Sequence, residues 1–240
     1  MPPQPTRPLF SNPKVNDTEQ SMDRSIIENT KAGFSLAEFR SARDKTFEAV
    51  NRISQSIKVG MNEDEGNLVV KTILSEMGSA KSWHKGFIRF GANTLKGFSD
   101  KSETGVRLQS DDIYFIDIGP VWGEYEGDGG DTFAVGNNPE MVRCAQDVKT
   151  VFHLTSEAWK KSGLTGKELY EFADQAAKKL GWTLNLDING HRLADFPHAV
   201  YFRGGLSEVE FKPTSNLWML EIQIRHPTLS FGAFYEDLLS

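Results

Sequence analysis

The stretch IYFIDIGPVWGEYEGDGGDTFAVG, residues 113–136, contains two aspartates in unusual surroundings. Residues 113–118 are apolar on both faces of a predicted strand, yet Asp117 lies among them. Burial of an ionised carboxylate is costly unless a cation, a metal ion or several hydrogen-bond donors compensate it. Asp128 follows eleven residues later, after a glycine-rich hairpin that can bring two strands side by side. The stretch predicts two converging carboxylates, although acidic residues at alternate positions before Asp128 are also typical of a solvent-facing hairpin.

Two later stretches each place a glutamate in a predicted strand. NLWMLEIQIRH, residues 216–226, surrounds Glu221 with apolar side chains. Glu221 shares a strand face with Gln223, so that face could also be hydrated. SFGAFYEDLLS, residues 230–240, places Glu236 in an apolar C-terminal segment, which we expect to be held in the sheet.

The stretch NGHRLADFPHAVYF, residues 189–202, supplies two of the five histidines. Imidazole is the commonest side-chain metal ligand and carries protons near neutral pH, although a lone histidine is more often structural. Together with the acids, this predicts four carboxylates and one imidazole in a single cluster. Such ligands suit two divalent ions of the Mn, Co, Fe or Zn type that share carboxylates, and four positive charges would neutralise four negative ones. The candidate ligands are Asp117, Asp128, His191, Glu221 and Glu236.

Helix signals occur twice along the chain. Ser35 followed by Glu38 predicts a capping box at the start of one helix, and a second helix is predicted over 63–77. Strands are predicted over 86–90 and 112–118, and further helices over 139–161 and 167–180. Gly60 and Gly163, and likewise Gly78 and Gly181, lie 103 residues apart. This spacing favours an internal duplication about as much as coincidence, and a duplication predicts an α+β fold with antiparallel strands inside and helices outside.

Composition narrows the class of protein. The 240 residues carry 27 basic and 33 acidic side chains, and this net charge of -6 argues against a nucleic-acid binder. No apolar run reaches the roughly 20 residues that span a bilayer, and the N-terminus lacks the apolar core of a secretory signal. The single cysteine, Cys144, excludes an internal disulfide framework and a cysteine-rich zinc site. We therefore expect a cytoplasmic globular protein.

The ordered pattern of candidate ligands resembles that of the pita-bread metallopeptidase superfamily, which includes methionine aminopeptidase, aminopeptidase P, prolidase and creatinase. The resemblance covers residues 35–240 and includes "IDIG", "TFAVG", "GH", "LEIQI" and "FYED". It is greatest to short aminopeptidase-P-like proteins, through Trp83–Thr94 and the "FPH" loop. It implies an α+β pita-bread fold, with a curved antiparallel sheet, a pseudo-twofold repeat and outer helices. We expect residues 1–34, which begin with a proline-rich stretch, to form a flexible N-terminal extension and lead-in before a single pita-bread domain of residues 35–240.

The resemblance implies roles for the site residues. The five candidate ligands would bind two divalent ions, Glu221 would also act as general base, and His198 would contact the scissile amide. The superfamily's peptidases carry a further histidine near 96–99, which this sequence lacks. Further His and Arg groups of the proline-specific members correspond to Asp187 and Phe234. His84 is a candidate catalytic replacement for the missing histidine, or else a strand-edge histidine.

The expected function is that of a dimetal-dependent hydrolase of the aminopeptidase P or prolidase type. The alternatives are a dimetal enzyme for a non-peptide small molecule, including iron-dependent redox chemistry, and a non-catalytic binding protein. We expect a small-molecule or short-peptide substrate, no nucleic-acid or membrane partner, and a possible homodimer. The N-terminal domain of longer relatives is expected to be absent, so loops or a second subunit would gate the substrate. The aromatic residues expected to wall a narrow pocket are Trp83, Tyr125, Phe196 and Phe202.

Overall fold

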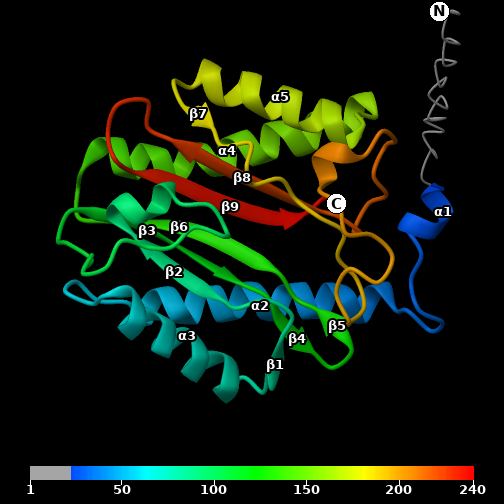
Figure 1. The fold of residues 1–240 in the computed structure, drawn as a ribbon, viewed down its shortest axis with the longest axis horizontal. Coiled ribbons are helices and arrows are strands. Elements are labelled where there is room, and N and C mark those ends of the chain that lie inside the picture. Colours follow the sequence, from blue (N-terminus) through cyan, green and yellow to red (C-terminus); the bar gives the residue numbers. More distant parts are fainter. Residues whose placement is uncertain (1–22) are drawn as a thin grey trace, which may run out of the picture.

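A six-stranded antiparallel sheet lies at the centre of the computed structural model, which describes residues 23–240 (Figure 1). Its strand order is β2-β3-β6-β9-β8-β7, and a small second sheet has the order β1-β4-β5. In the view of Figure 1, helices α2 and α3 lie below the strands and α4 and α5 above them, and both pairs pack on the sheet face that points away from Asp117 and Glu221. The helices are α1 (Arg24–Ile27), α2 (Leu36–Ser56), α3 (Glu63–Glu76), α4 (Pro139–Ser162) and α5 (Gly166–Lys179), with 3-10 turns at Gly91–Leu95 and Leu206–Glu208. The strands are β1 (Lys81–Ser82), β2 (Phe87–Phe90), β3 (Asp112–Ile118), β4 (Pro120–Trp122), β5 (Tyr125–Glu126), β6 (Gly129–Val135), β7 (Thr183–Leu184), β8 (Met219–Arg225) and β9 (Gly232–Leu238).

The sheet is built from two similar halves. Strands β6 and β9 meet at its centre, β3 and β8 flank them, and β2 and β7 form the edges. Each half begins with a long helix and a shorter helix before its strands. Gly78 and Gly181, 103 residues apart, follow the shorter helices with φ of 85° and 83°, a conformation that favours glycine. The α+β class and the outer helices predicted from the sequence are therefore confirmed.

Strand β3 is buried along its whole length. Tyr114, Ile116 and Ile118 belong to the core that α2 and α3 cover. Phe115 and Asp117 point the other way and line a cavity. One face of the strand packs in the core and the other faces the cavity, which explains why the sequence is apolar on both faces and yet contains an aspartate.

The helix starts mostly follow the capping signals. Helix α3 has a complete capping box between Asn62 and Glu65. At α2, Ser35 Oγ accepts a hydrogen bond from the Glu38 amide at 3.4 Å, but the predicted return bond from the Glu38 side chain is not formed. The Ser35 amide instead donates to the Tyr125 hydroxyl at 2.9 Å. A tertiary contact has replaced half of the predicted box.

Residues 23–34, which belong to the predicted extension and lead-in, pack against the domain. Ile27 is buried in the core, and Glu28 accepts hydrogen bonds from Trp218 Nε1 at 2.8 Å and from the Thr214 amide at 2.6 Å. An apolar side chain and a multiply bonded carboxylate explain this docking. The rest of the predicted extension, residues 1–22, lies outside the described residues. Among residues 23–240, no helix has both the length and the apolar character needed to cross a membrane.

Candidate metal centre

Strand register aligns three carboxylates across the sheet. Asp117 on β3 pairs with Gly130 on β6, Gly130 pairs with Glu236 on β9, and Glu236 pairs with Glu221 on β8. Residues directly opposite each other share a face of a sheet, so the three acids point to the same side. A Cβ at position 130 would lie 2.4 Å from the Phe234 ring and 3.0 Å from Glu236 Oε1, so glycine leaves the space that this row needs.

Asp128 and His191 complete the predicted set. Asp128 precedes Gly130 by two residues, is 2% exposed, and lines the same cavity as the three acids. His191 lies in the loop after β7. Isolated β-bridges between His191 and Gly205 and between Arg192 and Trp218 hold this loop in place. Its Nε2 lies 3.0 Å from Asp128 Oδ2 and 3.3 Å from Glu221 Oε1. The structure thus brings all five predicted ligands to one cavity.

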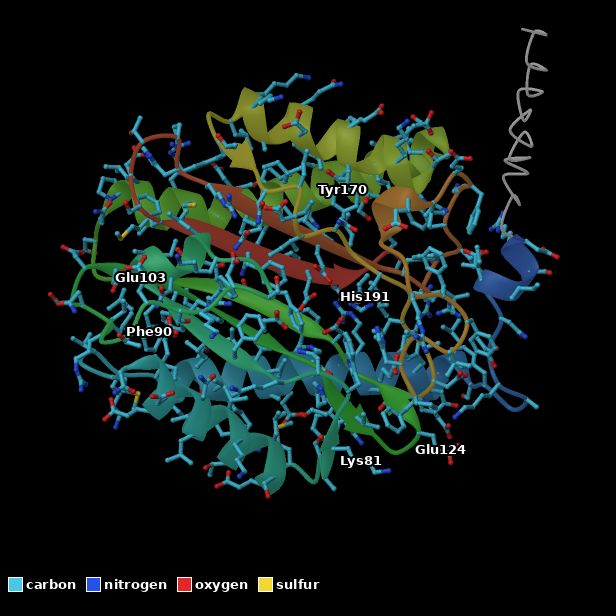
Figure 2. The ribbon with its side chains drawn as sticks, in the orientation of Figure 1. Lys81, Phe90, Glu103, Glu124, Tyr170 and His191 are labelled. Atoms are coloured by element: carbon cyan, nitrogen blue, oxygen red, sulfur yellow. The ribbon has the colours of Figure 1, made fainter. Side chains whose placement is uncertain are left out.

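The Tyr170 hydroxyl ties this loop to the sheet. Tyr170 belongs to α5, and Figure 2 labels it together with His191. Its hydroxyl accepts a hydrogen bond from the Gly190 amide and donates one to the Glu221 carbonyl at 3.1 Å. One buried side chain therefore fixes the backbone of two neighbouring candidate positions, His191 and Glu221. Nothing in the sequence distinguishes Tyr170 from an ordinary apolar position of an amphipathic helix.

His84 lies against the two aspartates. Its Nε2 is 3.3 Å from Asp128 Oδ1 and 3.5 Å from Asp117 Oδ1. One ligand atom from each of these three residues lies within 4.8 Å of the others, a grouping that could hold a metal ion. The side chain of His84 is only 7% exposed.

The cavity has a volume of about 320 Å³ and contains all the candidate ligands together with His84 and His198. Of the four aromatics expected to wall it, only Trp83 does so. Tyr125 packs against Phe34 and Phe39, and Phe202 packs against Trp218 in the core. Phe196 lies beneath the ammonium group of Lys81. The apolar walls come instead from other strands and loops: Phe87, Phe98, Phe115, Ile188 and Phe234.

His198 is held by Glu126, one of the acids at alternate positions for which a solvent-facing hairpin was the alternative interpretation. Its Nδ1 lies 3.1 Å from Glu126 Oε2, and its ring stacks on Trp83 with centroids 3.8 Å apart. Glu126 is 2% exposed, so the alternation that suggested a hydrated face was misleading. The Nε2 atom of His198 has no hydrogen-bond partner among residues 23–240. The ring therefore offers one free nitrogen beside the candidate ligands.

The positions at which the resemblance implies a departure from the peptidases line this cavity. Lys96, Gly97 and Phe98 line the cavity in the segment for which the resemblance implies a histidine in the peptidases, and Asp187 and Phe234 also face the space. The buried Gln223 amide donates to the Thr94 and Lys96 carbonyls at 3.0 Å each, which fixes the course of the first segment. None of Lys96, Gly97 and Phe98 supplies an imidazole there.

The carboxylates are undercompensated by the protein alone. Burial raises the pKa of Asp117 to about 7, against the lowering effect of His84. Burial and the neighbouring acids raise the pKa of Glu236 well above its usual range. Burial disfavours a charged His84, but Asp117 and Asp128 outweigh this and raise its pKa to about 9. Buried Glu236 Oε1 has no hydrogen-bond partner among the described residues, and buried Asp128 Oδ2 has no hydrogen bond of good geometry there, although His191 Nε2 lies 3.0 Å away. Such unpaired buried oxygens fit a bound divalent cation.

Comparison with known proteins agrees with this geometry. The sequence profile of metallopeptidase family M24 matches residues 37–233. No curated protein matches the chain. The fold is similar to that of the prolidase from Pyrococcus horikoshii, with a TM-score of 0.73 and 22% identity over 90% of this chain and 61% of that one.

Two further solved structures share the fold. The X-Pro aminopeptidase from Thermotoga maritima gives a TM-score of 0.69 at 18% identity, over 90% of this chain and 63% of that one. The Xaa-Pro dipeptidase from Bacillus anthracis gives 0.67 at 21% identity, over 85% and 56%. The chain thus spans about three fifths of the length of these relatives, and the likeness at such identities concerns the fold.

Proposed function

The chain belongs to metallopeptidase family M24, and from this premise we propose that it is a dimetal-dependent hydrolase of the aminopeptidase P or prolidase type, acting on an amide or peptide bond. The observation that carries the proposal is the row of Asp117, Glu236 and Glu221 on the cavity face, joined there by Asp128 and His191. These five residues would hold two ions of the Mn, Co, Fe or Zn type. Such ions, when bound, polarise a substrate carbonyl and lower the pKa of a bound water.

Glu221 is the proposed general base. Its Oε1 faces His191 within the cavity, and its side chain is 16% exposed, so it can reach both a ligand position and the reacting water. The Tyr170 hydroxyl holds its backbone in place. A carboxylate in this position can take a proton from the water molecule as that water attacks the carbonyl carbon.

His198 is the proposed partner of the substrate amide. Glu126 occupies its Nδ1, so Nε2 is the nitrogen available to the substrate. From there it can donate a hydrogen bond to the carbonyl oxygen as negative charge develops on it. It can then transfer a proton to the nitrogen that leaves. The stacked Trp83 ring limits movement of the imidazole and so reduces the entropy lost in the reaction.

The cavity supports a small substrate. A volume of about 320 Å³ is at the lower end of ligand pockets, and phenylalanine side chains form much of its wall. Lys96 and Arg203 at the same cavity are the cations available to a substrate carboxylate. We therefore propose a small amide or amino-acid derivative as the preferred substrate, rather than ordinary aminopeptidase or Xaa-Pro peptides.

A second candidate function is dimetal chemistry on a non-peptide molecule, including iron-dependent redox chemistry. The observation that favours it is Gly97 and Phe98 at the cavity, where the superfamily's peptidases have a histidine. Oxygen consumption by iron-loaded protein in the presence of small organic acids and amines would support this candidate over the hydrolase.

The test is a substrate panel with protein reconstituted separately with each metal. Dipeptides, tripeptides and small-molecule amides are compared, and we expect hydrolysis of a small amide. Asp128→Asn should abolish turnover. Asp131→Asn is the matched control, because Asp131 lies three residues away and pairs with Lys149 at 2.7 Å outside the cavity. A kcat/KM of ~10⁴ M⁻¹s⁻¹ or above on peptides would indicate an ordinary peptidase. If no substrate is hydrolysed with any metal, the proposal is refuted.

A further inference from the structure

Asp128 presents a different oxygen to each of two imidazoles. Its Oδ1 lies 3.3 Å from His84 Nε2, and its Oδ2 lies 3.0 Å from His191 Nε2. A second carboxylate completes each side, because Asp117 lies 3.5 Å from His84 Nε2 and Glu221 lies 3.3 Å from His191 Nε2. The cavity therefore holds two sets of one nitrogen and two carboxylate oxygens, which share Asp128.

The two imidazoles are held in the same way. Nδ1 of His84 lies 3.2 Å from the Lys85 carbonyl oxygen, and Nδ1 of His191 lies 3.1 Å from the Arg192 carbonyl oxygen. A carbonyl oxygen only accepts hydrogen bonds, so each Nδ1 must carry the proton. Nε2 is then the nitrogen directed at the carboxylate oxygens. It donates to them while the ring is protonated, and it would offer its lone pair to a metal ion that displaces this proton. Metal-binding histidines commonly have this arrangement, with the second ring nitrogen donating to a carbonyl.

The backbone makes room for the His84 ring. A Cβ at Gly119 would lie 2.0 Å from His84 Cδ2 and 2.3 Å from its Nε2. Glycine two residues after Asp117 therefore lets the imidazole approach both aspartates. Trp83 packs edge-on against the same ring, with centroids 4.3 Å apart. The position of His84 is fixed by local packing as well as by charge.

His198 differs in the partner of each ring nitrogen. Its Nδ1 contacts the Glu126 carboxylate rather than a backbone carbonyl, and its Nε2 has no hydrogen-bond partner among residues 23–240. The Nε2 atom of His84 is directed at two aspartates. A histidine that handles substrate needs the first environment, whereas a ligand needs the second.

We propose that His84 is a sixth metal ligand, which completes a set with Asp117 and Asp128 as His191 does with Asp128 and Glu221. Each half of the centre then has one imidazole. The inference rests on the proposed dimetal function and replaces the catalytic role that sequence analysis gave to His84. Since imidazole suits borderline transition metals, this half would favour Fe, Co or Zn over Mg or Ca.

X-ray absorption of the intact protein loaded with two equivalents of cobalt or zinc tests the inference without a mutation. Imidazole scattering should correspond to one imidazole per metal ion. One imidazole per two ions would overturn the inference, because His191 alone would then be bound. Binding of fewer than two ions would instead overturn the dimetal proposal on which the inference depends.

Metal titration of variants gives a second test. His84→Ala should bind one of the two ions at least about 10-fold more weakly than the unaltered protein and should change the visible spectrum of the Co(II) form. His198→Ala is the matched control, since it removes an imidazole from the same cavity and should keep both ions. Unchanged affinity and spectrum in His84→Ala would overturn the inference. Far-ultraviolet circular dichroism checks folding, and His84→Gln replaces the alanine variant if that one unfolds.

Discussion

At the scale of single residues, the hydrogen-bond partners of its two ring nitrogens decide what each imidazole in the cavity can do. His84 and His191 direct Nε2 at carboxylates, whereas His198 has a carboxylate at Nδ1 and no partner at Nε2 in the part of the chain that the structure describes. The same side chain thus serves two purposes within one cavity. The neighbours that impose this difference are Glu126 and Gly119, neither of which is itself a proposed ligand.

Glu126→Gln should impair turnover without loss of metal. The amide can donate to Nδ1 of His198, which would favour the opposite tautomer and remove the carboxylate that stabilises positive charge on the ring. We expect kcat to fall by roughly 10²-fold, as for loss of general acid–base catalysis, with KM and metal content nearly unchanged. Steady-state kinetics and elemental analysis measure both. Glu124→Gln is the control, because Glu124 is exposed at the adjacent turn (Figure 2), and an equal loss in both variants would contradict the assignment.

Gly119→Ala should reproduce the metal-binding defect of His84→Ala. The added methyl group would overlap the His84 ring, which must then leave the two aspartates. We expect at least about a 10-fold weaker affinity for one ion, as measured by titration of metal-free protein. Gly123→Ala provides a comparison for metal binding, because no atom lies within 4 Å of that Cβ position; its φ of 64° will make this variant less stable without touching the His84 ring. Full binding of both ions by Gly119→Ala would mean that the ring tolerates the methyl group.

At the scale of elements, the segment that contains α1 holds the loops behind the metal centre. Glu28 contacts Trp218 and Thr214, and the buried Arg192 guanidinium donates to the Ile27 and Asn29 carbonyls. Arg192 directly follows His191. The segment therefore supports the loop that carries a candidate ligand, although it lies outside the boundaries predicted for the domain.

Glu28→Ala should destabilise the protein. The change leaves the Trp218 indole N–H and the Thr214 amide without their acceptor. Loss of an acceptor for buried donors costs about 1–3 kcal/mol, and more when the lost group is charged. Urea denaturation should show a free energy of unfolding lower by roughly 2–4 kcal/mol. Glu48→Ala, at an exposed position of α2, should change the free energy of unfolding by less than about 0.5 kcal/mol.

At the scale of the whole molecule, the two halves of the sheet meet where their acids gather. Asp117 and Asp128 come from the first half and Glu221 and Glu236 from the second, so the centre exists only when both halves are folded together. Folding therefore concentrates negative charge at the junction. Protons or metal ions must compensate it.

Metal-free protein should lose stability as the pH rises. Folding raises the pKa of Asp117 from 3.8 to about 7 and the pKa of His84 from 6.5 to about 9. Between the lower and the higher pKa of each group, the native state therefore binds more protons than the unfolded chain. The free energy of unfolding must then fall from about pH 4 to about pH 9. The lowered pKa of Asp128 acts below this range. Urea denaturation with a chelator should show the fall, and added Zn²⁺ or Mn²⁺ should reverse it most at high pH. Stability that rises over this range would contradict the prediction.

Local patterns were sufficient for much of the fold. Helices over 139–161 and 167–180 and the strand over 112–118 were predicted within about two residues, because apolar periodicity, capping residues and Gly181 act over a few neighbouring positions. The order of Asp117, Asp128, His191, Glu221 and Glu236 also lies in the chain itself. A carboxylate in an apolar strand marks an unusual position whatever its partner is.

Tertiary structure decided the contacts between distant segments. Strand register and loop packing determine four of these contacts. They place His84 against Asp128 and Glu126 against His198. They also decide which aromatic residues wall the cavity and how residues 23–34 dock. Glu126 shows why: its alternating position suggested a hydrated face, but the loop that carries His198 covers it. Burial of a side chain is set by what packs on it, and a periodic sequence pattern contains no information about a partner seventy residues away.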